Sequence, residues 1–479
     1  MARARPRPWL IIVAVPVLLT VAAVSYLAWR QSVPGVRAEL RPAPKFLGVK
    51  TPLGIDVRAA RGGVQSIEVR VVQGSARAVV AQQAFATPFP AEQRVELIVN
   101  GRELGLREGA ATLEVRARDG FWRPIRVDER PIASLPVTLK LSPPTLEVLA
   151  ATHYLHQGGG GLAALRAKGA ARMGVKVGGQ LFPAYPVGES ELAVALFALP
   201  WNLPDATPIS AWAEDEAGNG VSRPLPSALK PRRFPSGTVD ISDKFLAAKL
   251  PELLPERAPI PAGQQVQAFL VVNRDKRKAA EDTKREVAGR TRPRPLWEGA
   301  FVQPRNTKVF SNFAESRSYR YEGKEIDTQV HLGFDLASLK NSPVPAANAG
   351  AVVFAGPLTI YGNAVIVDHG LGLQTLYGHL SSIEVKEGAD VKQGQELGRT
   401  GTTGLAVGDH LHFEVLIQGV SVTPVEWWDA KWIRDHIGRP LQEANVPLLQ
   451  SEFPADGPAG GGDERPAAPV RKRRSAPAR

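Results

Sequence analysis

The sequence predicts a mainly β protein with an N-terminal transmembrane helix, two immunoglobulin-like β-sandwiches, a helical connector and a strand-rich C-terminal unit. Two observations indicate this class. An uncharged run near the start is long enough to span a bilayer. Short segments rich in β-branched residues, bounded by turn residues, then recur along most of the chain. With 479 residues, the chain is too long for a single core and is expected to hold about three domains.

The composition limits the possible chemistry and partners. The chain has no cysteine, so neither a disulfide nor a thiolate metal site can form. Its formal net charge of +12 is spread along the chain and is not gathered in a nucleic-acid-binding module. A basic balance favours anionic envelope polymers or lipid head groups, and simple solubility explains it equally well. We therefore expect no nucleic-acid partner.

Residues 1–30 are predicted to be a cytoplasmic stub and a membrane anchor. The run Trp9–Trp29 contains no charged residue and would form a helix of roughly 31 Å, enough to cross a bilayer. Aromatic residues lie at both of its ends, where interfacial anchors belong. Pro16 would only kink the span.

Basic residues set the expected orientation of this helix. Three arginines precede the span, namely Arg3, Arg5 and Arg7. They should remain in the cytoplasm, which places everything after Arg30 on the periplasmic or extracytoplasmic side of the inner membrane. The alternative is a signal peptide cleaved after the small residues Val21-Ala22-Ala23.

Two consecutive regions, 39–136 and 137–233, are predicted to be β-sandwich modules. The strand-like segments are Ile67–Val72, Arg94–Val99 and Ala111–Arg118 in the first region, and Leu146–Leu149, Glu191–Phe197 and Ile209–Ala213 in the second. The sequences Ala117-Arg-Asp-Gly120 and Ala213-Glu-Asp-Glu-Ala-Gly218 resemble equivalent strand ends about 96 residues apart. This period fits two immunoglobulin-like sandwiches, which act as spacers or docking surfaces.

Residues 240–296 are predicted to be a helical connector. Ser242 or Asp243 can cap a helix through Phe245–Leu250, and the prolines at 251 and 255 are expected to interrupt it. A second helix is predicted over about Gly263–Gly289. Its charged residues should pair at i,i+4 on a solvated face, as Arg277/Glu281, Lys278/Asp282 and Glu281/Arg285.

The remaining chain is predicted to hold a strand-rich unit, 297–428, and a C-terminal extension, 429–479. The expected strands include Gly350–Phe354, Ala364–Val367 and Leu373–Tyr377. A short helix is expected after Trp428. The extension then becomes rich in proline, glycine and alanine and ends in the basic run Arg471–Arg474, which indicates a disordered tail.

The strand-rich unit contains a metal-site pattern in two pieces. His331 and Asp335 lie four positions apart in His-Leu-Gly-Phe-Asp and can converge on one ion from a strand end. His410 and His412 are two positions apart on an expected strand, so both imidazoles face the same side. Such a set suits tetrahedral zinc, where three protein ligands leave the fourth position for water.

Around these residues the sequence resembles the lysostaphin-type, LytM-like zinc endopeptidases of peptidoglycan. The resemblance covers about a quarter of the chain, from about Phe301 to Trp428. The matching segments are His331–Asp335, Pro343–Ala347, Gly362–His369, Thr375–Leu380, Val391–Gly398 and His410–Val415. Their order and spacing also match, and the family fold is a mostly antiparallel β-structure with an open groove.

The resemblance implies a role for each matching residue. His331, Asp335 and His412 would be the zinc ligands, and His379 and His410 would be the two catalytic histidines that do not bind the metal. The expected function is zinc-dependent cleavage of peptide bonds in peptidoglycan stem peptides or cross-links by a metal-activated water. The alternatives are a non-enzymatic envelope regulator, which binds peptidoglycan or activates other hydrolases, and a structural envelope protein. The sequence does not indicate which proteins it would bind.

Two residues beside the motifs are open to more than one interpretation. His369 matches a family position and is expected to be structural or to support the site from outside. Asp409 precedes the His-Leu-His motif, where it could hydrogen-bond a histidine and raise its basicity or be a solvated turn residue.

Overall fold

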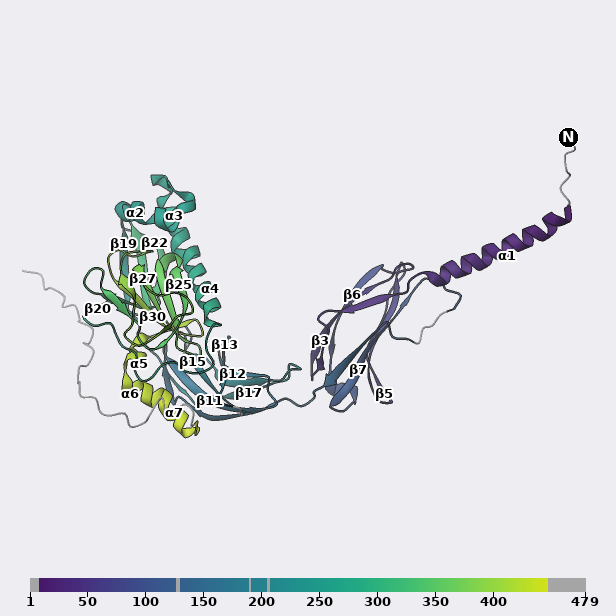
Figure 1. Ribbon diagram of the computed structural model, residues 1–479, viewed down its shortest axis with the longest axis horizontal. Helices are drawn as coiled ribbons and strands as arrows, with labels where there is room; N and C mark the ends of the chain where they lie inside the picture. The colour runs from purple at the N-terminus through teal and green to yellow at the C-terminus, as the bar shows by residue number, and fades with distance from the viewer. Residues whose placement is uncertain (1–7, 126–129, 189–190, 205–206, 447–479) are drawn as a thin grey trace, which may run out of the picture.

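The computed structural model describes residues 8–125, 130–188, 191–204 and 207–446. Figure 1 shows an elongated arrangement, with the N-terminal helix at one end, one pair of sheets in the middle and the rest of the chain at the other end. The protein is mainly β, as predicted. The arginines at positions 3, 5 and 7 and the basic run 471–474 lie outside the described residues.

Helix α1 (Pro8–Ser32) contains the predicted span. Its segment Val13–Ser32 has the length and hydropathy needed to cross a membrane, and none of this segment is buried in the protein. Pro16 lies within the helix, as expected. An uncleaved anchor and a cleaved leader both have these properties, so the choice between them remains a prediction.

The first β region forms two sheets around a core of its own. One sheet has the order β1-β3-β6, with β1 (Arg37–Leu40), β3 (Thr51–Arg58) and β6 (Glu92–Val99). The other has the order β2-β8-β7-β4-β5, with β2 (Phe46–Leu47), β8 (Ala133–Leu139), β7 (Gly109–Asp119), β4 (Val64–Gln73) and β5 (Ala76–Ala84). Alternate residues of β3 and β4 point into this core, because successive strand side chains face opposite sides.

The second β region likewise forms two sheets, each with four strands. The first comprises β14 (Tyr185–Pro186), β15 (Leu192–Ala198), β11 (Gly160–Lys168) and β9 (Thr145–Ala151). The second comprises β13 (Gln180–Pro183), β12 (Arg172–Val177), β16 (Ile209–Glu214) and β17 (Gly220–Pro224). Strand β10 (Tyr154–His156), which lies between β9 and β11 in the sequence, pairs in parallel with β18 (Ala228–Lys230), which follows β17. The predicted strands are therefore present in both regions, and their immunoglobulin-like character remains a prediction.

The second β region shares one hydrophobic core with the C-terminal part of the chain. Buried residues such as Phe197 on β15 belong to the same cluster as Trp427. The short C-terminal helices α5 (Pro424–Trp428), α6 (Ala430–Ile433) and α7 (Arg439–Glu443) follow the strands there. They include the short helix expected after Trp428.

The connector contains the predicted helices with two differences. Helix α2 (Asp243–Leu253) is capped by the Ser242 side chain, as predicted, but Pro251 lies inside it and does not interrupt it. The helix tolerates this proline in its last turn, two residues before its end. The second helical segment is divided into α3 (Gln265–Val271), a π-helical turn (Val272–Lys276) and α4 (Arg277–Ala288).

The C-terminal unit is built on a ten-stranded antiparallel sheet. Its main path comprises β20 (Lys308–Ser311), β23 (Phe334–Ala337), β30 (Leu411–Ile417), β27 (Leu373–Ile383), β26 (Asn363–Asp368), β25 (Gly350–Pro357) and β28 (Asp390–Val391). Three further strands join it at the side, namely β24 (Pro343–Pro345), β29 (Glu396–Thr400) and β31 (Val420–Val422). A smaller sheet of β19 (Ser236–Ile241), β21 (Glu315–Tyr321) and β22 (Lys324–His331) links this unit to the connector.

Candidate metal centre

Three strands bring the predicted ligands together. His331 is the last residue of β22, Asp335 lies on β23, and His412 lies on β30. Asp335 and His412 are directly opposite each other in the antiparallel register, which places their side chains side by side. Gly378 faces His412 from β27 and carries no side chain, so the imidazole has room on that side.

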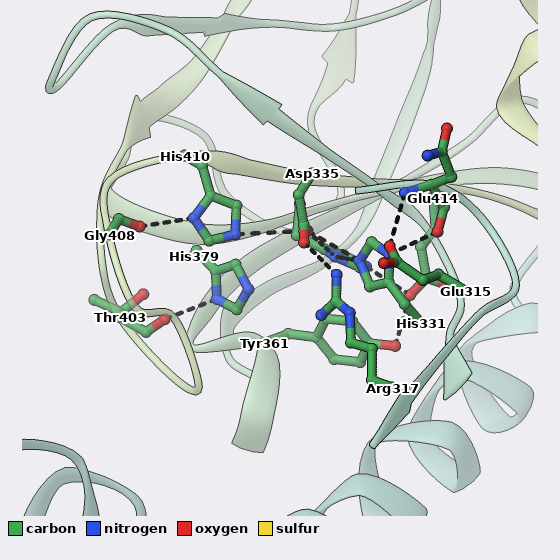
Figure 2. Close-up of polar contacts among 12 residues, drawn as sticks. Glu315, Arg317, His331, Asp335, Tyr361, His379, Thr403, Gly408, His410 and Glu414 are labelled. Carbon is green, nitrogen blue, oxygen red and sulfur yellow. Dashed lines mark hydrogen bonds and ion pairs between the residues drawn. The ribbon is translucent and has the colours of Figure 1, made fainter. Parts of the chain in front are cut away.

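The metal-facing atoms form a small triangle, shown in part in Figure 2. Nε2 of His331 lies 2.9 Å from Oδ1 of Asp335 and 3.0 Å from Nδ1 of His412, and the third side, from Nδ1 of His412 to Oδ1 of Asp335, is 3.0 Å. Tetrahedral ligands at zinc distances of roughly 2.0–2.1 Å lie about 3.3 Å apart. Two imidazole nitrogens and one carboxylate oxygen at this spacing would fit a zinc ion if the triangle widened by a few tenths of an ångström.

Each of the three ligands is oriented by a second partner on its far side. Nδ1 of His331 lies 2.9 Å from the backbone carbonyl oxygen of Asn312, and Arg317 donates to Oδ2 of Asp335 at 2.8 Å. On His412, Nε2 lies 2.9 Å from Oε1 of Glu414. Such outer partners fix the ring tautomer and raise the basicity of the ligand. The metal-facing atoms are therefore Nε2 of His331, Oδ1 of Asp335 and Nδ1 of His412.

His379 and His410 lie beside this triangle with their rings turned the same way. Nδ1 of His379 is 2.8 Å from the carbonyl oxygen of Thr403, and Nδ1 of His410 is 2.7 Å from that of Gly408 (Figure 2). A carbonyl oxygen can only accept a hydrogen bond, so each Nδ1 must carry the ring hydrogen. In the neutral ring, Nε2 then has a lone pair that can accept a proton. The two ring centres are 4.8 Å apart, and Nε2 of His410 is 3.5 Å from Oδ1 of Asp335.

Two features of His379 are typical of a functional residue. Its φ angle is +62°, a left-handed conformation that costs energy for any residue other than glycine and recurs at active sites. Burial, together with the nearby rings of His410 and His412, lowers the pKa of His379 well below its ordinary value. The side chain is therefore neutral at pH 7.

The acidic ligand remains ionised despite its burial. Burial alone would raise the pKa of Asp335, but the adjacent His331 and the close contacts with His410 and His412 hold it well below its ordinary value. An ionised carboxylate is the form that binds a cation.

A fully buried ion pair supports the site from the connector. Nζ of Lys284, on α4, lies 2.8 Å from Oε2 of Glu414 and 2.7 Å from Oε1 of Glu281. The hydroxyl of Tyr361 donates to Oε1 of Glu414 at 2.6 Å. Burial would raise the pKa of Glu414, but the Lys284 ammonium and His412 lower it, so the carboxylate that orients His412 stays charged.

A cleft of ≈ 430 Å³ opens over the metal triangle and the two histidines. One part of its wall comes from the ten-stranded sheet and its loops, including Tyr361 and Val407. The other part comes from the connector and the small sheet, including Val239, Phe245 and Arg277. The space is therefore shared between the metal centre and segments that precede it in the chain.

The other histidine and the acid singled out from the sequence lie outside this group. His369 is buried, with Nδ1 2.7 Å from the carbonyl oxygen of Ala349 and Nε2 2.8 Å from Oγ1 of Thr375. Asp409 accepts hydrogen bonds from Oγ1 of Thr400 at 2.6 Å and from the backbone N–H of Asn341 at 3.2 Å, which agrees with the turn residue of the two alternatives and not with a partner of a histidine.

Four supporting residues were not identified from the sequence, namely Arg317, Glu414, Lys284 and Tyr361. Glu414 alone had a usable signal, because it lies two positions after His412 and therefore on the same strand face.

Comparison with known proteins agrees with this geometry. Residues 329–424 match the sequence profile of Peptidase family M23. The chain is 38% identical over 117 residues to DD-carboxypeptidase/endopeptidase Mpg of Neisseria meningitidis serogroup B, a match that covers 24% of this chain and 27% of the relative. It is 38% identical over 119 residues to peptidoglycan DD-endopeptidase ShyA of Vibrio cholerae, covering 25% and 27%. The chain thus spans about a quarter of the length of these relatives.

Among solved structures, the catalytic domain of the antimicrobial peptidase lysostaphin from Staphylococcus simulans is 28% identical in sequence. The match covers 26% of this chain and 92% of that chain, with a TM-score of 0.23.

Proposed function

We propose that this chain, whose residues 329–424 form an M23 peptidase domain of the lysostaphin type, is a zinc-dependent endopeptidase that cleaves peptide bonds in peptidoglycan stem peptides or cross-links. The observation that carries the proposal is the triangle of His331, Asp335 and His412 beside two further histidines that turn Nε2 away from their backbone partners. In this proposal the triangle binds zinc, and His379 and His410 are catalytic.

Each group in the site has a defined task in peptide hydrolysis. A bound zinc ion would supply Lewis acidity, which polarises the scissile carbonyl group and acidifies water. Nε2 of one histidine would take a proton during attack and return it to the leaving amine, a service worth roughly 10²–10⁴ in rate. The other histidine, once protonated, would donate a hydrogen bond to the carbonyl oxygen as negative charge develops on it.

A non-enzymatic regulator is the second candidate. Such a protein would need the cleft but not a complete set of metal-binding and proton-transfer groups. All five of these side chains are present here, and each lies within reach of a neighbour in the cluster. The complete set favours catalysis.

The rest of the chain would place the enzyme at its substrate. In this proposal α1 anchors the protein in the inner membrane, and the two β regions, as immunoglobulin-like sandwiches, hold the peptidase domain at a distance from the bilayer on the extracytoplasmic side. Peptidoglycan is found on that side. The domain bounds predicted from the sequence are part of this proposal.

The test is digestion of isolated peptidoglycan by the purified full-length protein in detergent, with the muropeptide products identified by mass spectrometry. We expect products cut at a peptide bond, and we expect none from the Asp335→Ala variant. Intact sacculi after prolonged incubation with a zinc-loaded, folded protein would overturn the proposed activity and leave the regulator as the better interpretation.

A further inference from the structure

Arg277, the first residue of helix α4, lines the wall of the cleft that is formed by the connector. It lies outside residues 329–424, the segment that matches the M23 family. Its position is fixed by three contacts. Nε donates to the carbonyl oxygen of Asn273 at 3.1 Å, and Nη2 donates to Oδ1 of the same residue at 2.8 Å and to the hydroxyl of Tyr319 at 3.4 Å.

All three of these partners are neutral. Within the part of the chain that the structure describes, no carboxylate lies within ion-pair distance of the Arg277 guanidinium. The sequence predicted an i,i+4 pair with Glu281, but Glu281 turns to the buried Lys284 at 2.7 Å, so that expectation is wrong. A preorganised guanidinium whose direct partners are all neutral therefore lines the cleft.

Strand β21 relates Arg277 to the metal centre through two of its side chains. Arg317 and Tyr319 lie two positions apart on this strand and so face the same side. Arg317 holds Asp335, while Tyr319 contacts Arg277. At about 3.3 Å per residue, the backbone positions of Arg317 and Tyr319 are roughly 7 Å apart along the strand. An extended peptide covers the same length with about two residues.

We propose that Arg277 forms a carboxylate-binding subsite, which selects a peptide substrate bearing a free carboxylate about two residues from the scissile bond. Asn273 and Tyr319 occupy Nε and Nη2, which leaves the two N–H groups of Nη1 to donate charge-assisted hydrogen bonds to a carboxylate. This inference rests on the proposed function, because it assigns a preference to the same cleft. It also gives the connector a part in substrate selection.

The experiment compares two cross-linked stem peptides that are identical except that one carries carboxylates and the other the corresponding carboxamides. We expect the wild-type protein to cleave the carboxylate peptide with a kcat/KM about 10-fold higher or more, through a lower KM. Arg277→Gln should cleave both peptides equally, at the rate of the amidated one. Arg277→Lys should recover part of the preference.

Arg274→Gln is the matched control. Arg274 lies in the adjoining π-helical turn, is paired with Asp327 at 3.0 Å and does not line the cleft, so its loss should leave the preference intact. Isothermal titration calorimetry of the product peptides gives a second measure that does not depend on turnover. Arg277→Gln should weaken binding of the carboxylate product only, and Arg274→Gln should weaken neither.

Two results would overturn the proposal. One is a folded Arg277→Gln protein that keeps the wild-type preference, and the other is a variant whose kcat/KM falls equally for both peptides. Failure of the wild-type protein to cleave either peptide, or peptidoglycan itself, would instead refute the proposed function on which this inference rests.

Discussion

Nζ of Lys284 lies 2.8 Å from Oε2 of Glu414, and both side chains are fully buried. This pair joins two parts of the chain that are distant in sequence, because Lys284 belongs to the connector helix α4 and Glu414 to strand β30. Since Glu414 also holds Nε2 of His412, the connector is linked to a proposed metal ligand through a single carboxylate.

Lys284→Met should therefore affect both stability and metal binding. Removing one partner of a buried ion pair leaves an unpaired charge and costs about 3–5 kcal/mol of unfolding free energy. The looser Glu414 should also weaken zinc affinity by roughly 10–100-fold. Chemical denaturation and chelator competition measure the two effects. Lys278→Met on the exposed side of α4 is the control and should change neither.

The double variant Lys284→Met/Glu414→Gln separates the two effects. Without either charge, much of the lost stability should return, whereas zinc affinity should stay low because a neutral amide orients His412 less strongly. Zinc affinity that returned together with stability would show that the pair serves folding alone.

Each proposed ligand should be needed for metal binding. His331→Ala, Asp335→Ala and His412→Ala should each lose stoichiometric zinc, since three protein ligands leave no spare. Metal content after dialysis, measured by atomic emission, tests this. His153→Ala, an exposed histidine paired with Glu443, should keep its zinc. Full occupancy in all three variants would refute the ligand assignment.

The two other histidines should be separable from the ligands by the same assay. His379→Ala and His410→Ala should keep most of the metal and lose roughly 10²–10⁴ in kcat, because each provides proton transfer or stabilises the oxyanion. Loss of zinc from the His410 variant would mean that the two members of the His-Leu-His motif had been exchanged. Wild-type turnover by either variant would exclude its catalytic role.

Glu426 should make stability depend on pH. Burial raises the pKa of this carboxyl to about 7 from the ordinary value of 4.5. Between these values the folded protein binds more protons than the unfolded chain, so stability should fall as the pH rises from about 4.5 to about 7 and then remain level. The total loss is about 3 kcal/mol.

Glu426→Gln should remove most of this dependence and raise the unfolding midpoint at pH 8. The amide oxygen can still accept the hydrogen bond from the backbone N–H of Gly160, which the carboxylate now accepts at 3.0 Å. Thermal unfolding followed from pH 5 to pH 8 tests this, with the exposed Glu147→Gln as control. Parallel stability curves for the Glu426 variant and the wild type would contradict the prediction.

The orientation in the membrane can be tested with reporters. A periplasmic reporter fused after Arg479 should be active, and a cytoplasm-dependent reporter at the same position should be silent, because basic residues before the span favour the cytoplasm. N-terminal sequencing of the membrane-extracted protein should begin at or near Met1. A soluble form that starts just after Ala23 would replace the anchor with a cleaved signal peptide.

The parts of the site that could be predicted are those encoded locally. His-Leu-His places two rings on one strand face because the strand period is two, and the structure has His412 and Glu414 on β30 with that alternation. The strands of both β regions could also be predicted from local sequence, because the alternation of β-branched residues determines which face of a strand is buried. Pairings between strands, such as Asp335 opposite His412, depend on contacts across many residues.

The parts that were missed depend on tertiary contacts. Lys284 lies in a helix with a strongly charged pattern, and such lysines are normally solvated, so nothing near it in sequence indicates a buried carboxylate partner 130 residues later. Arg317 likewise finds Asp335 only because β21 pairs with β22. The predicted pair Glu281/Arg285 is replaced by Lys284–Glu281 and Arg285–Asp282, each three residues apart.

The shared core of the second β region and the C-terminal unit limits how this protein can be divided. A fragment trimmed to the family match, 329–424, would lack Trp427 and would leave bare the apolar surface that now meets β11 and β15. Engineering that transfers residues 329–424 alone would thus expose apolar side chains that are buried in this protein. The smallest unit that keeps this core whole therefore begins before β9 and includes the second β region.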